Sequence, residues 1–175
     1  MSRKYSIGEK VIYSQSGVCS VEDITVNEFC GELTEYYVLR PLYDSGSVIY
    51  VPTGNETLVS RIRETMTADE VDGIISYMPV AENIWIDNDN KRKEAYSAIL
   101  LENEPRRLTE MIRTLRSRRD EQRLKKKRLH IADENILERA QRILSDEISY
   151  VLGVDRGSVD SYIVSRVEET EAKDA

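Results

Sequence analysis

The hydrophobic pattern of this chain changes its period once, between residues 53 and 66, and the change divides the sequence into two modules. Before it, short runs of β-branched and aromatic residues are separated by Gly, Asp and Ser, as in antiparallel strands. After it, apolar residues recur every three or four positions, as on the buried face of a helix. We therefore predict an α+β chain with a β domain over residues 1–65, an all-helical domain over 66–168 and a disordered tail over 169–175.

The strand signals lie within residues 5–52. Their apolar runs are interrupted by turn signals at Ser16-Gly17, at Gly31 and at Asp44-Ser45-Gly46. The segment is too short for two stacked sheets of ordinary size. We expect a small five-stranded antiparallel barrel of the SH3-like or Tudor-like type.

The helical module begins with a capping-box pattern, Thr67-Ala-Asp-Glu70, and Pro79 ends this first helix. Further helices are expected over about 90–101, from Pro105, from a cap near Asp133 to Gly153, and from Ser158. The helix from Pro105 has a core-facing stripe in its first half only, because residues 116–128 are almost wholly polar.

Charge is segregated as sharply as periodicity. Residues 105–130 hold eleven Lys and Arg against three Asp and Glu, a net +8, in a chain of formal net charge −7, so the other residues sum to −15. A solvated helix face is the commoner origin of a charge run. One strongly basic element in an acidic protein nevertheless favours contact with a polyanion, and its arginines suit phosphate groups.

Trp85 is the only tryptophan, and two interpretations of it remain open. Its neighbours Ile84 and Ile86 favour a packing anchor between the modules, whereas the basic cluster that follows favours an exposed aromatic side chain that wedges against a DNA base step. The predicted nucleic-acid interface comprises one aromatic and seven basic residues: Trp85, Lys91, Arg92, Lys93, Arg113, Arg116, Arg118 and Arg119.

Signals of catalysis and of cofactor binding are absent from the sequence. His130 is the only histidine, Cys19 and Cys30 lack metal-ligand spacing, and no phosphate-binding glycine loop occurs. We expect no catalytic residue, metal, cofactor or small-molecule substrate. No apolar run is long enough to span a membrane and the N-terminus lacks a secretory signal, so we expect a cytoplasmic protein with reduced cysteines.

The opening segment, Tyr5-Ser-Ile-Gly-Glu-Lys-Val-Ile-Tyr-Ser-Gln-Ser-Gly-Val, resembles the N-terminal signature of the CarD (CdnL-type) family of bacterial transcription regulators. That signature also opens the polymerase-interacting domain of transcription-repair coupling factor. The resemblance continues in order to about residue 165, through residues 21–24, 36–39, 49–52, 108–115 and 138–147.

The resemblance implies a Tudor-like domain that docks on the β subunit of RNA polymerase and a helical domain that contacts promoter DNA at the upstream edge of the bubble. In the family a tryptophan wedges into the minor groove there, and open complexes live longer. Contact with DNA is then largely independent of base sequence.

The sequence departs from the family pattern at both interfaces. The position of the wedge tryptophan falls on Asp89, and arginines that contact polymerase in some members fall on Asn27 and Tyr50. We expect docking to depend on backbone pairing and apolar contact at an exposed strand. The predicted polymerase interface is Asn27, Phe29, Ile49, Tyr50, Val51 and Pro52. The alternative function is a general RNA- or ribosome-associated protein, held by the barrel and the basic helix.

Overall fold

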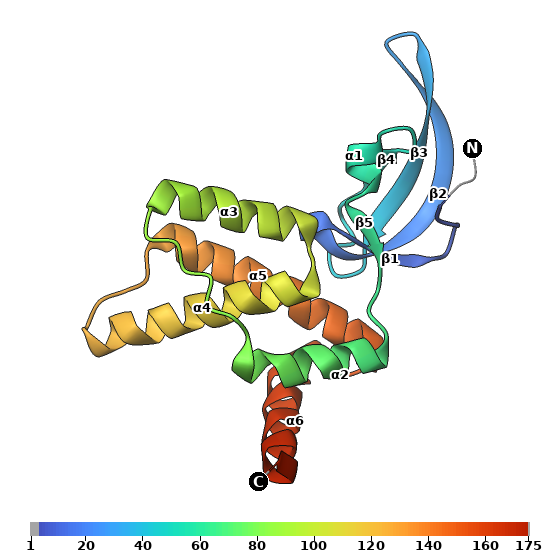
Figure 1. The fold of residues 1–175 in the computed structure, drawn as a ribbon. Helices are drawn as coiled ribbons and strands as arrows, with labels where there is room; N and C mark the ends of the chain where they lie inside the picture. Colours follow the sequence, from blue (N-terminus) through green and yellow to red (C-terminus); the bar gives the residue numbers. More distant parts are fainter. Residues whose placement is uncertain (1–3, 175) are drawn as a thin grey trace. The chain divides into compact units, whose positions relative to one another are not determined.

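The computed structural model describes residues 4–174, and the chain divides after Thr65 into two compact units. The first is a five-stranded antiparallel sheet and the second is helical, which confirms the predicted α+β class (Figure 1). No helix among the described residues is long and apolar enough to cross a membrane.

The sheet of the first unit has the order β4-β3-β2-β1-β5, and every neighbouring pair is antiparallel. Strands β4 and β5 therefore form its two edges. A bulge between Val21 and Asp23 bends β2 where the sheet curls. The elements are β1 (Lys10–Tyr13), η1 (Ser14–Ser16), β2 (Gly17–Phe29), β3 (Glu32–Pro41), β4 (Ile49–Pro52), α1 (Glu56–Val59) and β5 (Ile62–Glu64).

Alternating side chains of these strands form the core of the first unit. Val11, Val21, Leu39 and Val51 are fully buried in it. Tyr5 joins them from outside the strands: its ring packs edge-on against Tyr37, and its hydroxyl donates to the carbonyl of Ile62 at 2.8 Å. The segment before β1 is thereby attached to edge strand β5.

The hairpin of β2 and β3 extends beyond its neighbours in the sheet. Strand β1 pairs only with residues 17–20 of β2, and β4 pairs only with residues 36–39 of β3. The turn is Cys30-Gly31, with φ of +54° and +83°, as a two-residue hairpin loop with primed geometry requires. The projecting part exposes Val26 and Leu33.

The two cysteines differ in accessibility, which gives a direct test of the first unit. Cys19 is fully buried and burial raises its thiol pKa to about 12, whereas Cys30 is exposed at the hairpin turn. Because the thiolate is the reacting species, iodoacetamide should label one cysteine of the native chain, Cys30, and both after unfolding. Mass spectrometry of labelled wild type and of Cys30→Ser measures this. Native labelling of the Cys30→Ser variant would contradict the burial of Cys19.

The second unit contains five α-helices among its described residues: α2 (Ala68–Tyr77), α3 (Asp89–Glu102), α4 (Pro105–Leu124), α5 (Ile131–Leu152) and α6 (Val159–Asp174). Single turns η2 (Met78–Val80) and η3 (Arg156–Ser158) follow α2 and precede α6. Figure 1 shows α4 and α5 side by side and antiparallel, joined at one end by residues 125–130.

Local signals set most of the helix ends. The capping box of Thr67 and Glu70 is present, Asn88 caps α3, and Gly153 ends α5 with a left-handed backbone. We predicted the cap of α5 near Asp133. The structure has it at His130, whose Nδ1 accepts from the N–H of Ala132 at 3.3 Å. Asp133 lies instead in the first turn, where a buried ion pair occupies its carboxylate.

Helix α6 continues to Asp174, where the sequence led us to expect a disordered tail from residue 169. Side-chain contacts one turn apart support this extension: Arg166 pairs with Glu169 at 3.2 Å, and the hydroxyl of Thr170 donates to the Arg166 carbonyl at 2.9 Å. Ala175 lies outside the described residues.

The core of the second unit joins all five helices. Val71, Tyr96, Leu108, Leu137 and Val159 are among its buried members. The hydroxyl of Tyr96 donates to the carbonyl of Ile84, and burial raises its pKa to about 12. Helix α5 also presents Glu147, 1% exposed, whose carboxylate accepts from the N–H of Met66 at 2.8 Å.

Candidate functional site

The structure separates the basic run into cations with partners and cations without them. Five arginines of α4 lie within ion-pair distance of a carboxylate. These pairs are Arg106 and Arg107 with Glu110, Arg118 with Glu121, Arg119 with Glu134, and Arg123 with Asp120, at distances from 2.5 to 3.9 Å. Their charge is therefore partly balanced within the protein, and much of α4 is a solvated helix face.

Arg113 and Arg116 have neutral partners instead. Nη1 of Arg113 donates to the carbonyl of Ala81. The Nε of Arg116 faces the side-chain amide of Gln141 on α5, whose oxygen accepts at 2.8 Å in the amide orientation that satisfies both residues. The positive charge of these two side chains is thus not balanced by a described carboxylate at ion-pair distance.

The free cations of the run lie after α4, in the loop of Lys125, Lys126, Lys127 and Arg128, which we call the basic loop. All four side chains are exposed, and none has an ion-pair partner in the part of the chain that the structure describes. The loop begins with a left-handed turn that ends α4: Lys126 adopts φ of +55° and the N–H of Lys127 donates to the carbonyl of Gln122 at 2.8 Å.

Apolar side chains flank the basic loop. Leu129 is buried and holds the loop against the core, whereas Leu124 and Ile131 are 88% and 75% exposed. Exposed apolar residues beside uncompensated cations form a surface that suits a polyanion with accessible apolar groups. The sequence showed the charge of this loop, but our predicted interface omitted its four residues.

Lys91 and Lys93, in the first turns of α3, are the second group of free cations. Both are exposed, and neither has an ion-pair partner among residues 4–174. Between them lies Arg92, which is 3% exposed and makes a bidentate pair with Asp133 in the first turn of α5, at 3.0 and 2.7 Å. This pair brings the starts of α3 and α5 together, so the basic loop, which precedes α5, lies at the same end of the helical unit as Lys91 and Lys93 (Figure 1).

Arg92 itself must be removed from the predicted DNA-facing set. Besides Asp133, its guanidinium donates to Asp89 at 2.8 Å and to the carbonyl of Ile86 at 2.8 Å. The hydrogen bonds to Asp133 raise the pKa of Arg92, against the effect of burial. With these bonds made inside the protein, the side chain has no accessible donor edge to offer a phosphate.

Trp85 is a half-buried residue of the helical unit, packed against its core. Two guanidinium groups lie over its ring, Arg92 at 4.1 Å and Arg118 at 4.7 Å from the centroid, and its indole N–H donates to Asp87 at 3.0 Å. The preceding backbone is also held, because the N–H of Ile84 donates to Thr114 at 2.9 Å. These contacts favour the interpretation of Trp85 as a packing residue. Its partners named here belong to the helical unit, whereas the predicted anchor was to lie between the two modules.

The predicted polymerase residues all lie in the first unit. Asn27 is exposed on the projecting hairpin, and the side chain of Phe29 lies outside the described part of the structure. Edge strand β4 carries the other four: Tyr50 is 53% exposed, Ile49 and Pro52 are half-buried, and Val51 is fully buried in the core. The side chain of Val51 is therefore unavailable to a partner.

The free edge of β4 presents the backbone of Tyr50. The N–H of Thr53 donates to Glu35 of β3 at 2.9 Å, so alternation along the strand turns the N–H and carbonyl of Tyr50 away from β3. Its ring packs edge-on against Tyr36, with centroids 6.2 Å apart. One backbone donor, one acceptor and an aromatic side chain are thus available at this edge.

Comparison with known protein families identifies a domain family for the first unit. Residues 5–63 match the CarD-like/TRCF RID domain family. This part of the chain is a CarD-like RID domain. The RID family interacts with RNA polymerase, which gives the protein a role connected with transcription. No curated protein matches the chain.

The RID match stops just before the end of the first unit and does not extend into the helical second unit. The matched range contains the opening segment and the free edge strand β4. RID domains act in protein interaction. Within residues 4–174, no group of three or more His, Cys, Asp or Glu side chains is gathered as a metal site.

Proposed function

We propose that the protein docks on the β subunit of RNA polymerase through its RID domain and contacts promoter DNA near the upstream edge of the bubble through its helical unit. Open complexes then live longer. The observation that carries this proposal is the RID match on a unit with a free edge strand. The free cations of the second unit support the DNA contact.

Docking at β4 is an addition of one strand to the sheet. The polymerase segment pairs with the backbone of Tyr50 and packs against its ring, while Ile49 and Pro52 supply apolar contact. Such pairing needs no charged side chain. The protein can therefore dock although it has Asn27 and Tyr50 where some family members have arginine.

Replacement of Tyr50 tests this docking mode. Tyr50→Pro removes the outward N–H and the aromatic ring, and proline is tolerated where the N–H of an edge strand faces solvent. We expect the affinity of the full chain for RNA polymerase to fall about tenfold or more, since one hydrogen bond and one aromatic contact are lost. Binding is measured by titration of polymerase with fluorescently labelled protein.

Tyr43→Ala provides the matched control, because Tyr43 is an exposed aromatic residue of the same unit outside β4. We expect it to bind polymerase as wild type does. Polymerase affinity that is unchanged in Tyr50→Pro, with the variant folded by circular dichroism, would rule out docking at this edge.

The proposed DNA contact is made by the basic loop with Lys91 and Lys93. Lysine and arginine contacts to phosphates fix position without selecting base sequence. These six cations lie at one end of the helical unit in a protein of net charge −7, so we expect weak binding to free duplex DNA. When polymerase holds the protein and the promoter together, the effective concentration of the DNA is higher and the same contacts suffice. A general RNA- or ribosome-associated protein would instead bind nucleic acid tightly without polymerase.

We place the stabilising effect in phosphate contacts and not in an inserted tryptophan. Asp89, at the family wedge position, is an acidic side chain 73% exposed and paired with Arg92. Trp85 is engaged by two arginines and by Asp87. Release of Trp85 for insertion requires loss of these contacts, whereas the free cations need no rearrangement to meet the backbone.

A further inference from the structure

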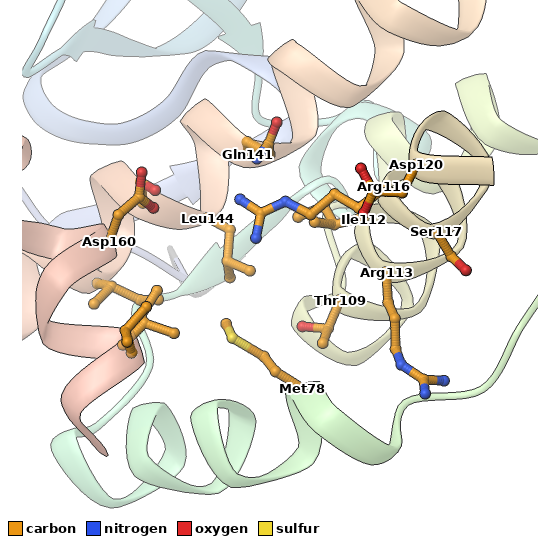
Figure 2. A pocket seen from close by; sticks show the side chains of 14 residues that line it. Met78, Thr109, Ile112, Arg113, Arg116, Ser117, Asp120, Gln141, Leu144 and Asp160 are labelled. Carbon is orange, nitrogen blue, oxygen red and sulfur yellow. The ribbon is translucent and has the colours of Figure 1, made fainter. Parts of the chain in front are cut away.

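The helical unit contains a cavity of about 580 Å³ that neither the polymerase contact nor the DNA contact uses (Figure 2). It lies among α4, α5, α6 and the single turn η2 that follows α2, all within one unit. Cavities of this size between helices of a bundle are typical of small-molecule sites.

The inner wall of the cavity is apolar. Ile112, Leu144 and Ile148 are buried side chains of α4 and α5, and Met78 and Ile163 extend the wall as half-buried residues. Thr109 also lines it, but its hydroxyl donates to the carbonyl of Pro105 in its own helix at 2.8 Å. This wall offers contact to a hydrocarbon body and little hydrogen bonding to a polar one.

Two arginines without an ion-pair partner among the described carboxylates line the cavity. Arg113 and Arg116, the two α4 arginines with neutral partners, both line it, whereas the α4 arginines paired with carboxylates do not. In Figure 2 the Arg116 guanidinium extends from α4 toward Gln141, above Leu144, and that of Arg113 points away from them. Arg116 is therefore the cation placed beside the apolar wall.

Two carboxylates also border the cavity. Asp120 has Arg123 at 3.9 Å, which partly balances its charge. Asp160 comes from α6, and Figure 2 shows it across the cavity from α4, on the side toward which the Arg116 guanidinium extends. An anionic group bound at the Arg116 guanidinium has the apolar side chain of Leu144 next to it.

From this arrangement we propose that the cavity binds a small anionic amphiphile, namely an aliphatic carboxylate of medium chain length. The carboxylate accepts hydrogen bonds from Arg116, and the chain lies along Ile112, Leu144 and Ile148. This site requires neither the polymerase contact nor the DNA contact.

Titration calorimetry of the full-length protein with decanoate, below the concentration at which decanoate forms micelles, tests the site. We expect saturable binding of one decanoate per chain. Decan-1-ol, which lacks the charge, should bind at least tenfold more weakly, and Arg116→Gln should weaken decanoate binding by about tenfold. Amide shifts in NMR spectra should map to residues around Thr109, Ser145 and Val164, which line the cavity.

Arg106→Gln is the matched control, because it removes a cation of the same helix whose carboxylate partner, Glu110, does not line the cavity, and it should bind decanoate as wild type does. Ser145→Leu fills the space and should abolish binding, with its fold checked by circular dichroism. The absence of saturable binding at millimolar decanoate would overturn the proposal. So would equal affinity for decanoate and decan-1-ol, or unchanged binding by both Arg116→Gln and a folded Ser145→Leu.

Discussion

Asp133→Ala should lower the free energy of unfolding of the helical unit by about 3–5 kcal/mol, because it removes one partner of a buried ion pair. The side chains of Arg92 and Asp133 are 3% and 4% exposed and make two hydrogen bonds, at 3.0 and 2.7 Å. Without Asp133, the buried guanidinium keeps only exposed Asp89 as a charged partner. The unfolding temperature should fall by roughly 10 °C or more.

Asp89→Ala is the matched control for this prediction. It removes the other carboxylate of the same arginine, but from a side chain that is 73% exposed, so we expect a loss of less than about 1 kcal/mol. Both variants are compared by denaturant unfolding followed through Trp85, whose ring lies 4.1 Å from the Arg92 guanidinium. Equal stabilities of the two variants would show that the buried pair contributes no more to stability than the exposed one does.

Replacement of the basic loop should have the largest effect on DNA binding. With Lys125, Lys126, Lys127 and Arg128 all changed to Gln, we expect the slope of log K against log salt to become shallower by about 3.6, or 0.9 for each lost phosphate contact. The measurement is the salt dependence of duplex binding by the full chain. Stability should be unaffected, because all four side chains are exposed and none has an ion-pair partner among the described residues.

A pair of double variants separates position from net charge. Lys125→Gln with Lys127→Gln, and Arg142→Gln with Lys173→Gln, change the net charge equally and alter exposed side chains of the same unit. Only the first pair should reduce the salt slope, by about 1.8. If the second pair reduced the slope as much, the basic loop would affect DNA binding only through the net charge of the protein and not through phosphate contacts of its own.

The sequence predicted well those features that depend on residues close together in the chain. The capping box of Thr67 and Glu70 and the left-handed Gly153 depend on residues within one turn, and both are present. Alternation of apolar residues likewise predicted the sheet, since a strand with one buried face has a period of two. The family signature over the strands added the RID domain.

The site was harder to predict because its geometry depends on distant residues. Arg92 and Asp133 are 41 positions apart, so nothing near Lys91 and Lys93 showed that the arginine between them is buried. The stacking of Arg118 on Trp85 is equally non-local. By contrast, the pairing of Arg107 with Glu110 and of Arg118 with Glu121 follows an i, i+3 spacing. That spacing was a signal that much of the charge on α4 is balanced and that the free charge lies in the loop.

The lifetime of promoter open complexes formed by RNA polymerase with the full chain tests the central claim most directly. The wild-type protein should lengthen this lifetime. Tyr50→Pro and the quadruple basic-loop variant should each lose most of the effect, the first because it docks weakly and the second because it lacks phosphate contacts. An unchanged lifetime with wild-type protein bound to polymerase would contradict the account, as would full activity of the folded quadruple variant.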